Sequence, residues 1–431
     1  MRIVLPVLAA ALFWAAPLAA QQAATPEQVA AAALEAAPVW DGHNDVPWQL
    51  RDRYDNMIAG FDFHDTQAQG EGTPLETAMH TDLPRLRAGR VGAQFWSVFV
   101  PVTLVPEAEA VQATIEQIDV TRRLIAAYPD DLQLALSADE VEQTMAAGRI
   151  ASLIGMEGGH SIGSSLAVLR QMYALGARYL TLTHSANTRW ADSATAAPEH
   201  GGLTGFGKQV VREMQRIGML VDLSHVSEAT MMDALDVAAE DGGAPVIFSH
   251  SGARAVNGHA RNVPDAVLTR LKDNGGIVMV VALPAYVSEA SRQHAAARAA
   301  ERARLEALWA GQPDQVTAGL AQWDAANPEV LATVSDMADH IDHIRQVAGI
   351  DHIGLGADYD GMPTGPVGME DVAGYPALFV ELARRGYSQA DLEKIASRNM
   401  MRVLRAAEAY AAAHAGVPPI EAVIETAVED Q

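Results

Sequence analysis

Short apolar segments recur along the chain, and most of them are followed by a segment with the hydrophobic pattern of a helix. Nearly continuous apolar strands are typical of a parallel sheet that is covered on both faces. Strands that alternate with helices indicate an α/β fold, and eight such units over 431 residues predict a (β/α)8 barrel. The eight segments are Val39–Asp41, Ala93–Val100, Ala151–Met156, Ala177–Thr183, Gly218–Ser224, Pro245–Ser249, Gly275–Leu283 and His352–Ala357.

An open doubly wound sheet is the alternative architecture, but no Gly-x-Gly-x-x-Gly motif follows the first apolar segment. Two long connections, Val46 to Arg90 and Pro284 to Ala348, would lie at the carboxyl face of a barrel, where active sites form. The second contains the helical stretch Glu289–Trp309, which we interpret as a rim cover, a lid or a dimer contact. The expected helices are Glu107–Ala127, Ser164–Leu175, Phe206–Ile217, Glu228–Ala238, Pro264–Asn274, Pro376–Arg385, Gln389–Ile395 and Asn399–Ala413.

Six of the eight apolar segments end in a histidine or an acidic residue. The first ends in His43 and Asp45, which lie two residues apart and so point to the same side of a strand. A barrel brings the carboxyl ends of its strands to one mouth, so these side chains should meet there. The residues at the other five ends are Glu157, His184, His225, His250 and Asp358.

Such a cluster predicts a site for divalent cations. Unpaired charges in a closed mouth cost several kcal/mol each, and bound cations offset that cost. The chain has no cysteine, so all the ligands must be nitrogen and oxygen atoms, which suits zinc. Two cations about 3.5–4 Å apart can hold a hydroxide and polarise a carbonyl group. The neighbourhoods Asp222–His225 and Ser249–Ser251 are expected to supply supporting hydrogen bonds.

The remaining histidines and the lysines fit such a site less well. His340 and His343 are spaced as on a helix, and we expect both at the surface. Many barrel amidohydrolases bridge their metals with a carbamylated lysine, but Lys208, Lys272 and Lys394 all fall in expected helices. The lysines therefore favour a carboxylate bridge.

The net charge limits the classes of partner, and the hydropathy pattern indicates how the chain is divided. A net charge of −24 disfavours nucleic acid and anionic membranes as partners. Residues 1–20 have the pattern of a signal peptide, which predicts a secreted or periplasmic protein, and no later segment is long and apolar enough to span a bilayer. The remaining divisions are a tether (21–38), the barrel domain (39–413) and an acidic tail (414–431), which does not resemble a lipid-anchor signal.

Nine short segments, taken in their order along the chain from about Trp40 to Ala407, together resemble the membrane dipeptidase (renal dipeptidase) family of dizinc peptidases. This resemblance implies two Zn²⁺ ions, with His43 and Asp45 on one, His225 and His250 on the other, and Glu157 bridging them. The segments that carry it are Asp41–Asp45, Thr81–Leu86, Gly92–Ser97, Met156–Gly158, Leu180–His184, Asp222–His225, Phe248–Ser251, Arg261–Asp265 and Gly356–Gly361.

The resemblance also implies how a substrate is held and cleaved. His184 and Arg261 would bind the substrate, and Asp358 would be the acid/base group beside the scissile bond. The expected activity is therefore that of an exopeptidase that hydrolyses dipeptides with a metal-bound hydroxide. The resemblance also suggests a homodimer. The alternatives are another metal-dependent amidohydrolase, acting on cyclic amides or lactones, and a binding protein with a degenerate site.

The sequence departs from the family pattern in three respects. Without cysteine, the intersubunit disulfide of mammalian relatives cannot form. No lipid-anchor tail is apparent, so a membrane anchor is not expected. The seventh apolar segment ends in Val280–Leu283, where relatives often present a polar or aromatic pair, and this leaves the side-chain preference open.

Overall fold

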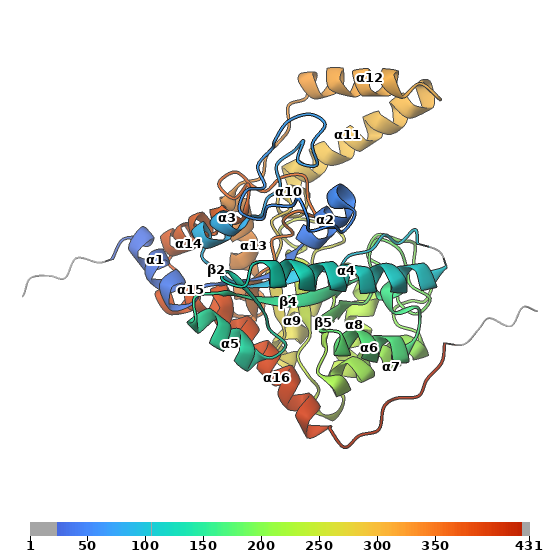
Figure 1. Ribbon diagram of the computed structural model, residues 1–431, viewed down its shortest axis with the longest axis vertical. Coiled ribbons are helices and arrows are strands. Elements are labelled where there is room, and N and C mark those ends of the chain that lie inside the picture. Colours follow the sequence, from blue (N-terminus) through green and yellow to red (C-terminus); the bar gives the residue numbers. More distant parts are fainter. Residues whose placement is uncertain (1–23, 105, 425–431) are drawn as a thin grey trace, which may run out of the picture.

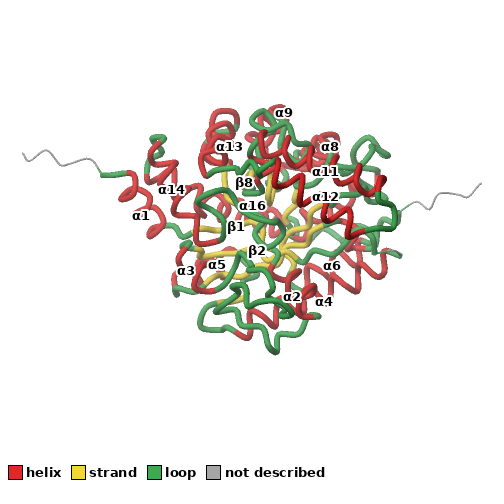
Figure 2. The backbone as a smooth tube through the Cα atoms, turned by 90° about the horizontal axis from the view of Figure 1, so that it is seen from above, coloured by secondary structure: helices red, strands yellow, loops and turns green. Residues whose placement is uncertain are grey.

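Eight parallel strands close into a barrel with helices around it, which confirms the predicted (β/α)8 architecture (Figures 1 and 2). The computed structural model describes residues 24–104 and 106–424, so the predicted signal segment 1–20 and part of the predicted tail lie outside the described residues. The ring of strands is closed by the pairing of β1 with β9 and of β2 with β4. The strands are β1 (Val39–Asn44), β2 (Val91–Ser97), β3 (Leu132–Leu134), β4 (Ile150–Glu157), β5 (Ala177–Thr181), β6 (Leu220–Asp222), β7 (Ile247–Ser251), β8 (Ile277–Val280) and β9 (Ile353–Leu355).

The strand β3 is an addition that the sequence patterns did not predict. It pairs in parallel with Ile150–Ser152 at the start of β4. Farther along the same edge of β4, from Ile154 onward, the pairing strand is β5. Three residues are too few to show a period of two, so this strand carries no sequence signal of its own. It extends the sheet outside the barrel and leaves the eight-stranded ring unchanged.

Side chains from non-adjacent strands fill the barrel interior. The ring centroids of Phe95 on β2 and Tyr179 on β5 lie 4.9 Å apart, although β4 separates these two strands. Gly155 on β4 makes this contact possible, because a Cβ atom there would collide with the Tyr179 ring. At the opposite end from the carboxyl ends of the strands, Met400 and Leu404 of α16 (Asn399–Ala413) join the same buried cluster.

The predicted helices are confirmed, with small shifts at their ends. The expected ranges Glu107–Ala127 and Glu228–Ala238 coincide with α4 and α8. Local signals explain such agreement; for example, the Ser227 side chain accepts a hydrogen bond from the Thr230 backbone N–H at the start of α8. The other barrel helices are α2 (Val46–Tyr54), α3 (Leu83–Ala88), α5 (Ala138–Ala146), α6 (Leu166–Ala174), α7 (Gly205–Ile217), α9 (Asp265–Asn274), α10 (Pro284–Val287), α13 (Val334–Val347), α14 (Tyr375–Arg384) and α15 (Gln389–Glu393).

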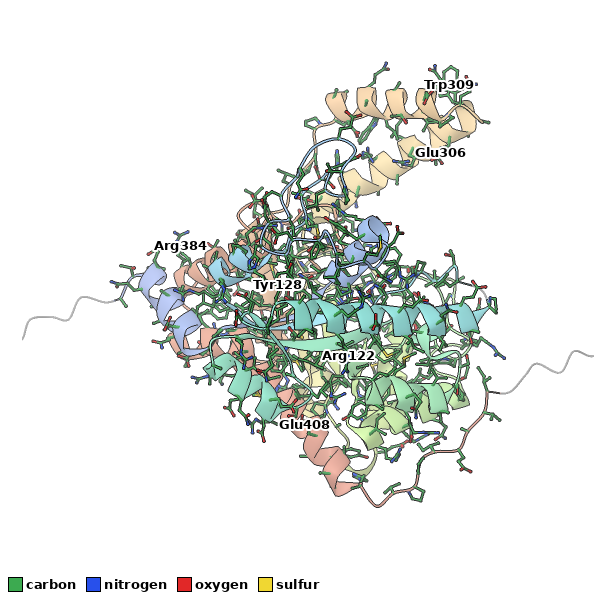
Figure 3. All side chains as sticks on the ribbon, in the orientation of Figure 1. Arg122, Tyr128, Glu306, Trp309, Arg384 and Glu408 are labelled. Carbon is green, nitrogen blue, oxygen red and sulfur yellow. The ribbon has the colours of Figure 1, made fainter. Side chains whose placement is uncertain are left out.

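Two helices of the connection after β8 extend away from the barrel. They are α11 (Glu289–Leu308) and α12 (Pro313–Ala326), which pack against each other as a hairpin (Figure 1). Trp309 marks the tip of this hairpin in Figure 3, and it is 36% exposed. At the other end of the chain, α1 (Pro26–Ala36) packs against α14 and α15. Among the described residues, no helix combines the length and the apolar character that crossing a bilayer requires.

The expectation that His340 lies at the surface is wrong. Its ring is fully buried on α13, where Nδ1 accepts a hydrogen bond from the Ala253 backbone N–H and Nε2 lies 3.0 Å from the Val287 carbonyl oxygen. Helix α13 packs against both α9 and β8, so its inner face is buried along its length. The sequence spacing showed a helix, but the face that His340 occupies depends on these distant partners.

Candidate metal centre and substrate pocket

The end of β1 is held in place by Asp41, which is fully buried. Its Oδ1 accepts hydrogen bonds from the backbone N–H groups of His43 and Ala357, so this carboxylate ties β1 to the end of β9. Its Oδ2 accepts from the Tyr375 hydroxyl at 2.7 Å. Burial raises the pKa of Asp41 to about 6, against the hydrogen bonds from Tyr375, His43 and Ala357 that lower it. These bonds fix the direction in which His43 leaves the strand.

Glu157, the last residue of β4, lies at the centre of the predicted cluster. Its Oε2 is 3.5 Å from His43 Nε2, which in turn is 3.3 Å from Asp45 Oδ2. Its other oxygen, Oε1, is 2.9 Å from His225 Nε2 and 3.4 Å from His250 Nε2. The two carboxylate oxygens thus face two different pairs of side chains. The structure brings together all five residues that were predicted as metal ligands.

Hydrogen bonds behind the cluster set which ring nitrogen of each histidine is free. His43 Nδ1 lies 2.9 Å from the Tyr179 hydroxyl, which can donate onward to the Gly42 carbonyl oxygen. His250 Nδ1 lies 2.8 Å from Ser249 Oγ, whose hydroxyl donates to Asp222 Oδ2. Because the second chain of bonds ends on a carboxylate oxygen, which accepts, Nδ1 of His250 donates to Ser249, and its Nε2 presents a lone pair toward Glu157. The Tyr179 hydroxyl can fix the orientation of the His43 ring. The predicted support from the neighbourhoods Asp222–His225 and Ser249–Ser251 is present, and Asp222 and Ser249 supply it to His250.

The electrostatic environment keeps Glu157 and His225 in the protonation states that ligands need. For His43, burial acts to lower the pKa, but Tyr179, Glu157 and Asp45 outweigh it and raise that pKa well above its usual value. Burial acts to raise the pKa of Glu157, but His43, His225 and His250 outweigh it and hold that pKa well below its usual range. Burial, with the positive charge of Arg261, lowers the pKa of His225 well below its usual value. Glu157 is therefore ionised and His225 is neutral near pH 7, as cation coordination requires.

Several atoms of the cluster lack the partners that buried polar atoms normally have. His43 Nε2 and Asp45 Oδ1 are buried without a hydrogen-bond partner among the described residues. The Nε2 atoms of His225 and His250 face each other at 2.9 Å, where two lone pairs would repel. A buried polar atom without a partner costs roughly 1–3 kcal/mol. A divalent cation would satisfy such atoms, and the nitrogen and oxygen donors fit zinc.

A pocket of about 590 Å³ opens above the cluster. Arg261 lies in its wall and is 1% exposed, with Nη1 and Nη2 3.4 and 3.3 Å from Ser251 Oγ and the His250 carbonyl oxygen. Its Nε is buried and has no hydrogen-bond partner among the described residues, so the guanidinium retains an unused donor. Tyr286 covers its face, with the guanidinium carbon 5.5 Å from the ring centroid. This wall can accept an anionic group.

His184 and Asp358, the other two predicted site residues, also line this pocket. His184 Nε2 is 3.8 Å from Glu157 Oε1, and its ring stacks on that of His225 with centroids 4.3 Å apart. Asp358 has a carboxylate oxygen within 4.8 Å of donor atoms of His43 and Asp45. Burial raises the pKa of Asp358 well above its usual value, and Asp45 and Glu157 raise it further while His43 opposes them. Asp358 is suited to hold a proton near the cluster.

The sequence analysis missed the aromatic side chains that complete the site. Trp48 and Phe99 form a wall of the pocket, with ring centroids 5.0 Å apart, and Phe99 packs on His184. Tyr179, whose hydroxyl reaches His43, lies two residues before Thr181 on β5 and therefore on the same face of that strand. This alternation along β5 is the sequence signal that could have placed Tyr179 on the same face as Thr181. Trp48, Phe99 and Tyr286 lie on connections, and no periodic pattern marks them.

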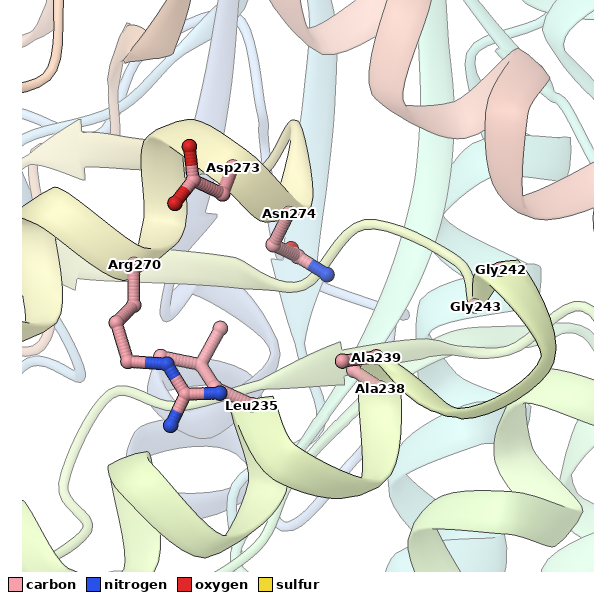
Figure 4. Close-up of a pocket in the computed structure, with 8 residues that line it drawn as sticks. All are labelled: Leu235, Ala238, Ala239, Gly242, Gly243, Arg270, Asp273 and Asn274. Carbon is pink, nitrogen blue, oxygen red and sulfur yellow. The ribbon is translucent and has the colours of Figure 1, made fainter.

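Another pocket among the described residues has polar side chains that are already paired. A pocket of about 310 Å³ lies between the ends of α8 and α9, and Figure 4 shows Arg270, Asp273 and Asn274 around it. Arg270 is already paired with Asp236, and the Asn274 side chain bonds the Val246 N–H and the Ala244 carbonyl oxygen. The lysines lie on α7, α9 and the helical turn Lys394–Arg398, so their predicted helical positions are confirmed.

Comparison with known proteins identifies the family. The membrane dipeptidase (peptidase family M19) profile matches residues 27–416. Dipeptidase 3 of Rattus norvegicus is 41% identical over 391 residues, which cover 90% of this chain and 68% of the relative. The probable dipeptidase PvdM from Pseudomonas aeruginosa shares the fold with a TM-score of 0.72 and 23% identity, over 89% of this chain and 99% of that one.

A second solved structure extends the comparison. A metallopeptidase from Rhodobacter sphaeroides, liganded with a phosphinate mimic of the dipeptide L-Ala-D-Ala, has a TM-score of 0.68 and 24% identity. The match covers 86% of this chain and 99% of that one. At this identity the likeness establishes the fold. With the family match over residues 27–416, this chain belongs to the membrane dipeptidase family and is a metallodipeptidase.

Proposed function

We propose that this enzyme is a dizinc exopeptidase that hydrolyses the peptide bond of dipeptides. The observation that carries the proposal is the division of the Glu157 carboxylate, with Oε2 beside His43 and Oε1 beside His225 and His250. A carboxylate with a different set of donors at each oxygen is suited to bridge two cations. When bound, the cations would supply an activated water and polarise the substrate carbonyl.

The side chains of this protein would perform the remaining tasks. Arg261 would hold the substrate's free carboxylate through its unpaired guanidinium donors, because a planar fork matches a carboxylate. His184, which also lines the pocket, would contact the substrate. Asp358, whose raised pKa favours the protonated form, would pass a proton to the leaving amine. Together these roles require a substrate with a scissile amide one residue from a free carboxylate.

The substrate class also draws support from the comparisons. The solved relative from Rhodobacter sphaeroides holds a dipeptide mimic, and the rat relative is named as a dipeptidase. A panel of dipeptides, tripeptides, a cyclic dipeptide and a lactone, each with and without chelator, tests the proposal. We expect chelator-sensitive cleavage of dipeptides alone. Cleavage of the cyclic amide or the lactone in preference would favour the other amidohydrolase class, and no hydrolysis would favour a binding protein.

The length preference has its own test in Arg261. A carboxylate–Arg contact contributes roughly 1.5–3 kcal/mol, or about one to two powers of ten in kcat/KM. Arg261→Ala should therefore impair cleavage of free-acid dipeptides by that factor and cleavage of their C-terminal amides much less. Equal losses on acid and amide substrates would contradict the carboxylate role.

Action outside the cytoplasm is also part of the proposal, on the evidence of the leader pattern in residues 1–20. Mass spectrometry of the protein from its native host should find a chain that begins near Gln21. A protein that retains Met1 in the cytosolic fraction would contradict export.

A further inference from the structure

The proton-carrying residue of the proposed reaction sits on a turn with an unusual backbone. The segment Asp358–Gly361 follows β9, and φ is +72° at Asp358 and +66° at Asp360. Residues other than glycine rarely adopt this left-handed conformation, and they keep it only where surrounding contacts hold them. The direction of the Asp358 side chain therefore depends on whatever fixes this turn.

Two reciprocal hydrogen bonds join the turn to His80. The His80 backbone N–H donates to Asp360 Oδ1 at 2.8 Å, and the Asp360 backbone N–H donates to His80 Nδ1 at 3.0 Å. The Asp360 side chain is 2% exposed and that of His80 is 17% exposed, so both bonds are shielded from water. The centroid of the His80 ring also lies 5.8 Å from that of Tyr359, the residue between Asp358 and Asp360 in the sequence.

His80 is itself held at a fixed point of the long connection between β1 and β2. Arg85 donates to the carbonyl oxygen of Met79, the preceding residue, and to Asp371 Oδ2. The carbonyl oxygen of His80 accepts a hydrogen bond from the Val372 N–H. The connection is thus bonded on both sides of His80, and the ring has a rigid base from which to hold the turn.

The turn leaves little freedom for the two carboxylates beside it. A Cβ atom built on Gly361 would lie 2.6 Å from Asp358 Oδ1 and closer still to Asp45 Oδ2. Both carboxylates therefore pack directly on the Gly361 backbone. A small rotation of the turn would move this backbone and displace Asp358 relative to Asp45.

We propose that His80 is a positioning residue: its reciprocal hydrogen bonds with Asp360 hold the Asp358–Gly361 turn in the conformation that presents Asp358 to the scissile bond. This inference rests on the proposed role of Asp358. His80 lies outside the lining of the pocket, whereas Asp358, Asp360 and Gly361 of the turn belong to that lining, so His80 acts on the reaction through the turn that carries Asp358.

Replacing His80 by alanine removes the ring acceptor and frees the Asp360 N–H. We expect His80→Ala to lower kcat for a dipeptide about tenfold, the effect of losing one buried hydrogen bond, with KM changed less than about twofold. Metal content should stay at the wild-type value. His64→Ala is the matched control, because His64 is exposed on the same connection, and it should match the wild type. Wild-type kcat in His80→Ala would overturn the inference.

Two longer variants separate positioning from general loss of structure. In His80→Asn the side-chain oxygen can take the place of Nδ1 as the acceptor of the Asp360 N–H, so kcat should recover to within about threefold of the wild type. In His80→Gln the longer side chain cannot place its oxygen there, and kcat should stay low. If His80→Ala does not fold, the difference between Asn and Gln carries the test. Equal kcat values for Asn and Gln would contradict positioning.

The last step places His80→Ala in an Asp358→Asn background. If His80 acts through Asp358, the double variant should have the same kcat as Asp358→Asn alone. A further tenfold loss in the double variant would show that His80 acts elsewhere and would overturn this inference. Wild-type kcat in Asp358→Asn would instead refute the proposed role of Asp358, so the two failures are distinguishable.

Discussion

The barrel mouth and the α11–α12 hairpin are held together in opposite ways. At the mouth, the five predicted ligands are buried and contact one another across different strands, as Glu157 on β4 contacts His43 on β1 and His225 after β6. In the hairpin, most of the ion pairs join residues of one helix, as Arg304 with Glu301, although Arg298 of α11 pairs with Asp324 of α12. Leu308 at the tip is 58% exposed. The mouth is therefore a cooperative assembly, whereas the hairpin is a sum of local contacts. Substitutions should have large effects at the first and small effects at the second.

Removing the central carboxylate should have the largest effect. Glu157→Ala would leave the paired donors without a bridge and two cations repelling each other, so we expect loss of at least one metal and of activity. Elemental analysis and turnover on a dipeptide check this. Glu306→Ala, at an exposed glutamate of the hairpin (Figure 3), is the matched control and should change neither. Two metals per chain with near-native turnover in Glu157→Ala would refute the bridging role.

The next effect concerns the proton carrier. Asp358→Asn keeps the shape of the side chain but removes the transferable proton, so kcat should fall by roughly 100-fold or more. Metal content and KM should remain close to those of the wild type. Steady-state kinetics with elemental analysis give both quantities. A lower melting temperature with little change in kcat would instead identify Asp358 as a structural residue.

Stability below neutral pH should distinguish the buried barrel from the exposed hairpin. Burial lowers the pKa of His340 from 6.5 to about 4. Between about pH 6.5 and pH 4 the imidazole is therefore protonated in the unfolded chain but neutral in the folded chain. Stability therefore falls as the pH falls through this window, by about 2 kcal/mol from this group at about pH 5. Urea unfolding at about pH 7.5 and pH 5 measures the loss.

His340→Gln provides the comparison for that measurement. Its amide can accept from the Ala253 N–H and donate to the Val287 carbonyl, yet it does not titrate. The variant should lose less stability between the two pH values than the wild type does. An equal loss in both proteins would show that other groups cause the pH dependence.

The smallest effects should come from the hairpin tip. Replacing Leu308 and Trp309 by serine removes exposed side chains, and surface changes of this kind usually shift stability by less than about 0.5 kcal/mol. Thermal unfolding and kcat/KM should remain at wild-type values. A loss of activity would show that the hairpin serves as a lid, and a change of molecular mass in light scattering would show a dimer contact there.

The same contrast explains what the sequence could and could not predict. Apolar segments with a histidine or an acidic residue at their ends predicted the barrel and the cluster at its mouth, because each of these residues stands at a position set by its own local pattern. The assignment of five of them as metal ligands came from the family resemblance. Helices such as α4 were predicted to the residue for the same reason. The burial of His340 and the contact of His80 with Asp360 were not predicted, because each depends on which distant segment packs nearby. Trp48 and Phe99 were missed for this reason too.

The absence of a side chain at Gly155, inside the barrel, has a consequence for mutational surveys of this protein. Any side chain there would displace the Tyr179 ring, and with it the hydroxyl that orients the His43 imidazole. A screen scored by protein abundance would count Gly155 among ordinary core positions. A screen scored by growth on a dipeptide nutrient, supplied with limiting zinc, would rank the same position with the metal ligands. The gap between the two scores at Gly155 would report how strongly the interior of the barrel governs its catalytic end.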